Sequence, residues 1–118
     1  MSRYERIPDF IKSLPEVDFP FPGARGWMIA GPEQQVVFVE FAQTVSVPEH
    51  SHDAQWEFAI AGKVEMTIDG ASQVYGAGDN FFIPKGTPHA ATVHAGYQAM
   101  MVFDAPDRYR AKGLLPDR

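Results

Sequence analysis

Short runs of apolar residues follow one another along the chain, and segments rich in glycine and proline separate them. The runs contain many Val, Ile, Phe, Tyr and Thr residues, which favour β-strands. In residues 63–68 the pattern alternates, with Val64, Met66 and Ile68 on one face of an extended chain and polar residues on the other. This alternation predicts a strand with one buried face and one solvated face.

Eight strands are expected in this way, and no helical pattern of about ten residues lies between them. Their expected ranges are 26–30, 35–41, 44–47, 56–60, 63–68, 80–83, 90–94 and 97–103. Short strands without intervening helices predict an all-β, antiparallel sandwich or barrel. The dipeptide Asp69-Gly70 is typical of a tight turn between two strands, because glycine tolerates positive φ. Short helical turns are expected only near the two ends, at 7–14 and 107–112.

The length of the chain predicts a single domain over residues 1–118, with an N-terminal arm at 1–25 and a C-terminal tail at 105–118. The formal net charge is -5 at pH 7, which argues against a nucleic-acid partner and against an anionic membrane surface. No apolar run approaches the roughly 18 residues of a membrane span, and no apolar stretch typical of a signal peptide follows the first residues. We therefore expect a cytoplasmic protein with no membrane or nucleic-acid partner.

The distribution of cysteine and histidine restricts the chemistry of any metal site. The chain has no cysteine, which excludes disulfides, thiolate metal sites and cysteine nucleophiles. Its four histidines, His50, His52, His89 and His94, all lie between residues 50 and 94. If the chain binds a metal ion, imidazole nitrogens and oxygen atoms must be the ligands.

His50 and His52 form a potential chelating pair. In extended backbone, side chains two residues apart point to the same face, with Cα atoms about 7 Å apart. His89 follows the turn at 84–88 and begins a later strand, which antiparallel pairing can bring alongside the first. These three histidines predict a metal site. His94 follows His89 by five residues, so we expect it on the opposite face of the strand as a surface residue.

Two residues could supply a further, oxygen ligand. Gln55 and Glu57 are two residues apart in an expected strand and therefore share a face. An ionised glutamate buried without a metal or a partner is costly, whereas hydrogen bonds alone can satisfy a glutamine amide. Coordination chemistry by itself favours Glu57 and leaves both residues as candidates.

Two segments resemble the motifs of the cupin family. Residues 48–62 resemble the first motif, in which two histidines separated by one residue precede a carboxylate ligand, a strand and a glycine. Residues 78–89 are similar to the second motif, which reads glycine, five residues, proline, one residue, glycine, two residues, histidine. With the surrounding strands, the resemblance extends over about 30–104. It implies a jelly-roll barrel, or double-stranded β-helix, of the RmlC-like type.

The resemblance also implies an assembly and a ligand set. Cupins of this kind commonly form homodimers through sheet edges and N-terminal strands, and the apolar segment 17–22 could make that contact or cap the core. In the first motif the acidic ligand lies seven residues before the glycine, and counting back from Gly62 gives Gln55. Some small cupins carry glutamine at this place. The implied ligands of one divalent transition metal (Fe, Ni, Zn, Mn or Co) are His50, His52, Gln55 and His89, with Glu57 as the alternative to Gln55.

Such a ligand set predicts the chemistry of the bound molecule. All four ligands are neutral, so the charge of the ion is uncompensated and should attract an anionic small molecule. We expect an enzyme that acts on a sugar acid or a keto or enol acid by isomerase, lyase or dioxygenase chemistry, with Glu57 as the catalytic proton-transfer residue. The alternatives are a non-catalytic small-molecule binding or sensing module and a structural barrel with incidental histidines. Arg25 and Lys85 are candidates to bind a substrate carboxylate, and the run 107–110 is expected to be an exposed polar helix or a dimer contact.

Overall fold

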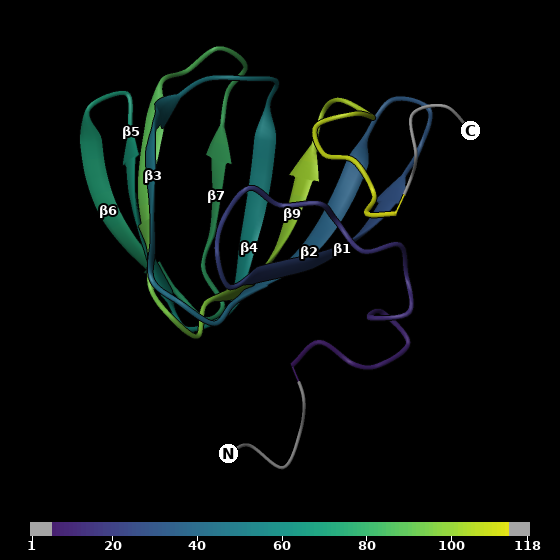
Figure 1. The fold of residues 1–118 in the computed structure, drawn as a ribbon. Helices are drawn as coiled ribbons and strands as arrows, with labels where there is room; N and C mark the ends of the chain where they lie inside the picture. The colour runs from purple at the N-terminus through teal and green to yellow at the C-terminus, as the bar shows by residue number, and fades with distance from the viewer. Residues whose placement is uncertain (1–5, 114–118) are drawn as a thin grey trace.

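The structure is a computed structural model that describes residues 6–113. In this range the chain forms nine strands in two antiparallel sheets (Figure 1). The strands are β1 (Ala24–Ala30), β2 (Gln35–Phe41), β3 (Val45–His50), β4 (Gln55–Ala61), β5 (Lys63–Ile68), β6 (Ala71–Gly76), β7 (Asn80–Ile83), β8 (His89–Val93) and β9 (Gln98–Phe103). One sheet has five strands in the order β1-β2-β9-β4-β7, and the other has four in the order β3-β8-β5-β6. The described residues include no helix that is long and apolar enough to cross a membrane.

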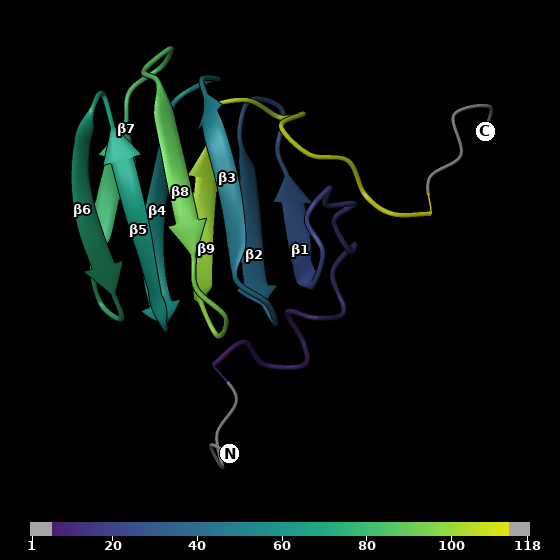
Figure 2. The same ribbon diagram turned by 60° about the vertical axis from the view of Figure 1, so that its left-hand side comes forward.

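The two sheets face each other, and Figure 2 shows the four-stranded sheet in front of the five-stranded one. Burial alternates along the central strands. In β2, Val37, Val39 and Phe41 are buried, whereas the residues between them are partly exposed. Buried apolar side chains from both sheets form one core between them. This arrangement confirms the expected all-β, antiparallel sandwich.

One strand, β6, is not predicted by the sequence pattern. It pairs with β5 at the edge of the four-stranded sheet, and residues 71–74 are all exposed. Alternation with period two marks a strand only when one of its faces is buried. A strand that is exposed on both faces therefore gives no such signal.

The prediction of helical turns at 7–14 and 107–112 is wrong. At 7–14 the chain makes hydrogen-bonded turns around Pro8 that do not continue into a helix. In 107–112 the backbone bonds to distant segments, as where the N–H of Lys112 donates to the carbonyl oxygen of Glu16 at 2.6 Å. Backbone groups that are paired in this way are not available for the bonds of a helical turn.

Two turns depend on glycine. Asp69 and Gly70 both have positive φ, 49° and 80°, which confirms the tight turn between β5 and β6. Gly62, between β4 and β5, has a φ of 73°, and an added Cβ would lie 2.7 Å from the carbonyl oxygen of Gly96 and from the Cα of Tyr97. Only glycine permits the backbone at position 62 to come this close to Gly96 and Tyr97. This close contact places Tyr97 next to the end of β4.

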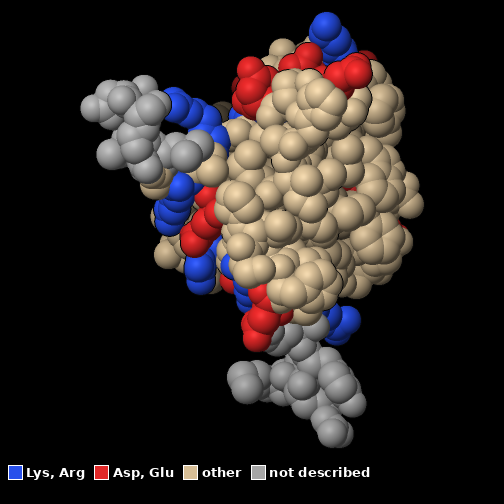
Figure 3. Space-filling model, turned by 90° about the vertical axis from the view of Figure 1, so that its right-hand side faces the viewer, with Lys and Arg blue, Asp and Glu red and all other residues tan. Residues whose placement is uncertain are grey.

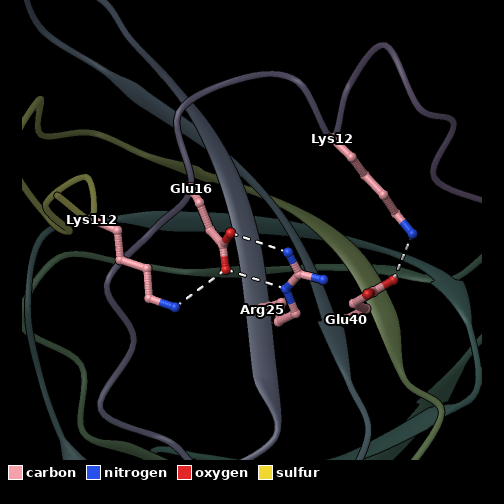
Figure 4. A network of polar contacts seen from close by, with 5 residues as sticks. All are labelled: Lys12, Glu16, Arg25, Glu40 and Lys112. Atoms are coloured by element: carbon pink, nitrogen blue, oxygen red, sulfur yellow. Dashed lines mark hydrogen bonds and ion pairs between the residues drawn. The ribbon is translucent and has the colours of Figure 1, made fainter.

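Charged residues tie the N-terminal arm to β1 and to the C-terminal tail (Figure 4). Glu16 accepts hydrogen bonds from the Arg25 guanidinium at 3.2 and 3.1 Å and lies 3.4 Å from Nζ of Lys112. The hydrogen bond from Arg25 is the main cause that holds the pKa of Glu16 below its usual value. A second pair joins Lys12 to Glu40 at 3.4 Å. All these groups are partly exposed, so each pair adds little stability.

A buried glutamine anchors the C-terminal tail. The side chain of Gln35 is fully buried, and its Nε2 donates to the carbonyl oxygens of Pro106 and Tyr109 at 3.0 and 2.9 Å. Its Oε1 accepts a hydrogen bond from the N–H of Tyr109 at 3.0 Å. Three hydrogen bonds to one amide set the path of the tail, and with it the position of Arg108.

Candidate metal centre

Three histidines from separate parts of the chain meet between the sheets. His50 ends β3, His52 lies in the following loop, and His89 begins β8, where it pairs with His50. Their ligand nitrogens all lie within 4.8 Å of one another, and among the described residues no carboxylate belongs to this group. The three histidines predicted from the sequence therefore form a group that could hold a metal ion.

Backbone carbonyl groups fix the orientation of the three rings. The Nδ1 atoms of His50, His52 and His89 lie 2.9, 2.7 and 2.9 Å from carbonyl oxygens one or two residues away. Because a carbonyl oxygen only accepts, each Nδ1 carries the proton, and the Nε2 lone pair of a neutral ring is then available to a metal. The Nε2 atoms of His52 and His89 face each other at 3.2 Å. Two lone pairs at this distance repel, and a cation bound by both removes the repulsion.

Burial keeps two of these rings neutral. Desolvation lowers the pKa of His52 to about 4 and also lowers the pKa of His89, although a backbone hydrogen bond opposes the shift in each. The positive charge of Arg108 lowers both further. Neutral imidazole is the form that binds metal ions. The geometry and the electrostatics of the cluster therefore both fit a divalent ion.

Gln55 and Glu57 lie at the start of β4 and point into the sandwich, with 7% and 5% of their surface exposed. The Nε2 of Gln55 donates to Oε1 of Glu57 at 2.8 Å, and the hydroxyl of Tyr97 donates to Oε2. Burial raises the pKa of Glu57 to about 7, although both hydrogen bonds act in the opposite direction. Burial, and then the charge of Glu57, raise the pKa of Tyr97, so its hydroxyl stays protonated.

These hydrogen bonds separate the two candidate oxygen ligands. The amide nitrogen of Gln55 donates a hydrogen bond to Glu57, and an amide nitrogen has no lone pair for a metal ion. The amide oxygen is therefore the atom of Gln55 that can bind an ion. Both oxygens of Glu57 already accept hydrogen bonds. The pattern agrees with Gln55 as the ligand and Glu57 as an unbound carboxyl group, and this assignment stays a prediction.

The polar groups line a cavity of about 80 Å³ between the sheets. Phe19 and Phe21 of the N-terminal arm form part of its wall, and Val17 is buried in the core. The segment 17–22 thus caps the core of its own chain. Beside His50 and His52 lies a more open hollow of about 390 Å³. Since one water takes about 30 Å³ in the liquid, the hollow has room for a small metabolite.

Arg108 is a cavity residue that the sequence analysis missed. It is partly buried and lines both the cavity and the hollow, so its segment is neither a helix nor a fully exposed run. Its guanidinium lies over the ring of Tyr109, 4.6 Å from the centroid. Its Nε is buried and has no hydrogen-bond partner among residues 6–113. The sequence gives no reason to prefer Arg108 over Arg110 as a cavity residue. Arg108 lines the cavity because the hydrogen bonds of Gln35 hold the tail in place.

The other basic candidates lie elsewhere. Arg25 pairs with Glu16 and Lys85 is exposed, and neither lines the cavity. The Nε2 of His94 lies 2.5 Å from the exposed Glu65. His94 is therefore on the outer side of the four-stranded sheet, as its separation from His89 predicts.

Comparison with known proteins agrees with this fold. The family profile Cupin_2, Cupin domain, matches residues 37–105. The chain belongs to the cupin family. The match spans all three site histidines, and it confirms the family that the two sequence motifs indicate.

Solved structures show the same fold. This cupin is similar to an RmlC-like cupin from Shewanella frigidimarina, with a TM-score of 0.69 and 26% identity over 80% of this chain and 86% of that one. It is similar to KdgF from a Halomonas species, with a TM-score of 0.68 and 24% identity over 78% of this chain and 86% of that one. A variant of oxalate decarboxylase from Bacillus subtilis has a TM-score of 0.66 and 21% identity over 81% of this chain and 28% of that one. No curated protein matches the sequence of this cupin.

Proposed function

We propose that this cupin is a metal-dependent enzyme that acts on a small anionic oxygenated metabolite, such as a sugar acid or a keto or enol acid, by isomerase or lyase chemistry. One divalent transition metal is held by His50, His52, Gln55 and His89, Glu57 transfers the proton, and Arg108 binds a carboxylate of the substrate. The observation that carries the proposal is the convergence of three histidine side chains, whose ligand atoms lie within 4.8 Å of one another, in a cavity that Arg108 also lines.

The charges around the cavity support an anionic substrate. The proposed ligands are all neutral, so they do not offset the charge of a bound ion. Arg108 adds a positive charge, and Glu57 is the only acidic residue among the described residues that line the cavity. A divalent ion at this position supplies a Lewis acid that polarises an oxygen atom of the substrate.

Arg108 is suited to bind a carboxylate in a defined orientation. A guanidinium presents its N–H groups in a planar fork that matches a carboxylate. Here the ring of Tyr109 supports one face of that fork, and Gln35 fixes the backbone of Tyr109. Because the side chain is already ordered, little conformational entropy is lost when an anion binds.

Glu57 is suited to move a proton near neutral pH. Its carboxyl group lines the cavity, and burial raises its pKa to about 7, close to the value that general acid–base catalysis at neutral pH requires. Gln55 and Tyr97 hold the two carboxyl oxygens in place. The group can therefore accept a proton from a carbon next to a carbonyl and return it to a neighbouring atom.

Replacing Arg108 with glutamine is expected to weaken the binding of pyruvate to the metal-loaded protein at least about tenfold, because hydrogen bonds to charged groups contribute about 1.5–3 kcal/mol. Isothermal titration calorimetry measures the effect. Arg110→Gln is the matched control, since Arg110 is exposed on the same tail, and it should bind pyruvate as the wild type does. Equal affinities in the two variants would contradict the role of Arg108.

Proton exchange tests whether the protein is an enzyme. Metal-loaded protein in heavy water is mixed with a panel of enolisable keto acids and uronic acids, and nuclear magnetic resonance follows the C–H groups next to each carbonyl. We expect exchange in at least one acid, slowed at least about 100-fold in Glu57→Gln, the range that general acid–base catalysis supplies. If an acid binds to the wild type and none of its C–H protons exchanges, the protein is a binding module and the enzyme proposal is contradicted.

A further inference from the structure

The cavity and the open hollow share five lining residues, which are Phe21, Val47, His50, His52 and Arg108. Residues that line both spaces lie where the two meet. The two histidines are proposed metal ligands, and Arg108 is the proposed partner of the substrate carboxylate. Phe21 and Val47 are apolar, and the proposed function gives neither of them a role. A molecule that reaches both the metal and Arg108 therefore also lies against an apolar surface.

This apolar surface continues along the four-stranded sheet. Val47 of β3 is paired with Ala91 of β8, and Ala91 is paired with Met66 of β5. All three residues line the cavity. Ala91 follows His89 by two residues, so both side chains point to the inner face of the sheet. An apolar row thus crosses three strands directly next to the histidines.

The N-terminal arm and the C-terminal tail supply a second apolar surface. The ring centroids of Phe19 and Phe21 lie 6.3 Å apart, and Phe19 meets the ring of Tyr109 edge to face at 4.8 Å. All three rings line the cavity. Aromatic contacts of this geometry are attractive, so the rings hold one another in place without a ligand.

Few polar side chains are left for other groups of a substrate. In the cavity, the hydroxyl of Tyr97 donates to Glu57, and both oxygens of Glu57 accept hydrogen bonds. Among the described residues that line the hollow, Ser51 is the one polar side chain besides the two histidines and Arg108. A sugar acid carries several hydroxyl groups, and each hydroxyl that loses water without gaining a partner lowers the affinity. The lining therefore favours an acid whose remaining part is apolar.

We propose that the substrate is a keto or enol acid with an apolar side chain, branched aliphatic or aromatic, and not a sugar acid. This substrate class rests on the proposed function, because it takes from it the metal ligands and the role of Arg108. The carboxylate binds Arg108, and the apolar group lies in the hollow against Phe21 and Val47. The hollow, of about 390 Å³, accommodates a group of several carbon atoms. Phe21 and Val47 thus determine the specificity of the site.

Isothermal titration calorimetry of the metal-loaded full chain tests the proposal with three acids that each carry one carboxylate: pyruvate, α-ketoisocaproate and α-ketogluconate. We expect α-ketoisocaproate to bind at least about tenfold tighter than pyruvate, because it adds three carbon atoms and each buried methylene contributes about fourfold in affinity. α-Ketogluconate has as many carbon atoms as α-ketoisocaproate but carries hydroxyl groups, and it should bind no tighter than pyruvate.

Phe21→Ala should lower the preference for α-ketoisocaproate over pyruvate at least about threefold, because it removes part of the apolar wall. Pyruvate is the internal reference, since a change that disturbed the whole site would weaken the binding of both acids. Should Phe21→Ala fail to fold, Val47→Thr keeps the branched shape of the side chain and replaces one methyl group with a hydroxyl. It should lower the same preference about threefold, because the hydroxyl loses water when the apolar group binds.

The outer face of the five-stranded sheet provides the matched control, because it is a second apolar surface. Figure 3 views this side of the molecule and shows a broad area with few Lys, Arg, Asp or Glu residues. Phe82 points to this side, since its neighbours Phe81 and Ile83 belong to the core, and it is 58% exposed. It lines neither the cavity nor the hollow, so Phe82→Ala should keep the preference of the wild type. An equal loss in Phe82→Ala and Phe21→Ala would overturn the proposal.

The outcomes distinguish this substrate class from the proposed function. If pyruvate and α-ketoisocaproate bind equally well and Arg108→Gln weakens both, the proposed function stands and the apolar side chain is wrong. The same conclusion follows if α-ketogluconate binds as tightly as α-ketoisocaproate, or if neither Phe21→Ala nor Val47→Thr changes the preference. If none of the three acids binds, or if Arg108→Gln binds them as the wild type does, the proposed function fails and the substrate class fails with it.

Discussion

Replacing His89 with alanine is expected to abolish stoichiometric metal binding. His89 is 4% exposed, and its Nε2 faces that of His52 at 3.2 Å, so the change removes a ligand from the centre of the group. Residues that merely support metal ligands change the affinity by about 10–100-fold, and loss of a direct ligand should cost at least about 100-fold. Elemental analysis of protein purified without a histidine tag measures the metal content.

Thermal melting gives an independent measure of the same loss. A ligand that binds only the folded state stabilises it in proportion to the logarithm of its concentration over its dissociation constant. A chelator should therefore lower the melting temperature of the wild type and leave that of His89→Ala unchanged. His94→Ala is the matched control, because His94 pairs with Glu65 on the outer side of the sheet, and it should behave as the wild type.

Two variants of cavity residues distinguish Gln55 from Glu57 as the oxygen ligand of the metal. Gln55→Ala should lower the metal affinity, and Glu57→Ala should retain most of it, because both oxygens of Glu57 are already hydrogen-bonded. Metal loss in Glu57→Ala alone would reverse this assignment. Equal metal content in the wild type and His89→Ala would contradict the site as a whole.

The histidine group could be predicted from the sequence because short-range backbone geometry determines it. His50 ends a strand, and His89 follows a turn in which Gly86 has a φ of 77°. Such turns leave a recognisable spacing of glycine and proline. The alternation of side chains along a strand likewise predicted that Gln55 and Glu57 share one face and that His94 lies on the face opposite His89.

Features that depend on contacts between distant segments could not be predicted. Arg108 reaches the cavity because Gln35, more than 70 positions earlier, bonds the tail on either side of it. The same long-range bonding replaces the helical turn expected at 107–112.

Replacing Gln35 with alanine is expected to destabilise the fold by about 3 kcal/mol and to release the tail. The change removes three partly buried hydrogen bonds, each contributing about 1 kcal/mol, and leaves backbone groups of Pro106 and Tyr109 without this partner. Chemical denaturation measures the loss. Gln34→Ala is the matched control, since the side chain of the exposed Gln34 donates one hydrogen bond, to Asp104 at 3.1 Å, and surface changes of this kind stay within about 0.5 kcal/mol.

Release of the tail should affect the two parts of the proposed site differently. The metal ligands should be retained, and Arg108 should lose its position. In Gln35→Ala the metal content should stay close to that of the wild type, because no metal ligand contacts the tail through Gln35. Binding of pyruvate should fall about as far as in Arg108→Gln, since Arg108 loses the backbone that places it beside the histidines. Trypsin should cut after Arg108 or Arg110 faster than in the wild type, because cleavage follows local unfolding. If Gln35→Ala matched Gln34→Ala in stability, cleavage and pyruvate binding, the tail would not depend on Gln35, and Arg108 would need another anchor.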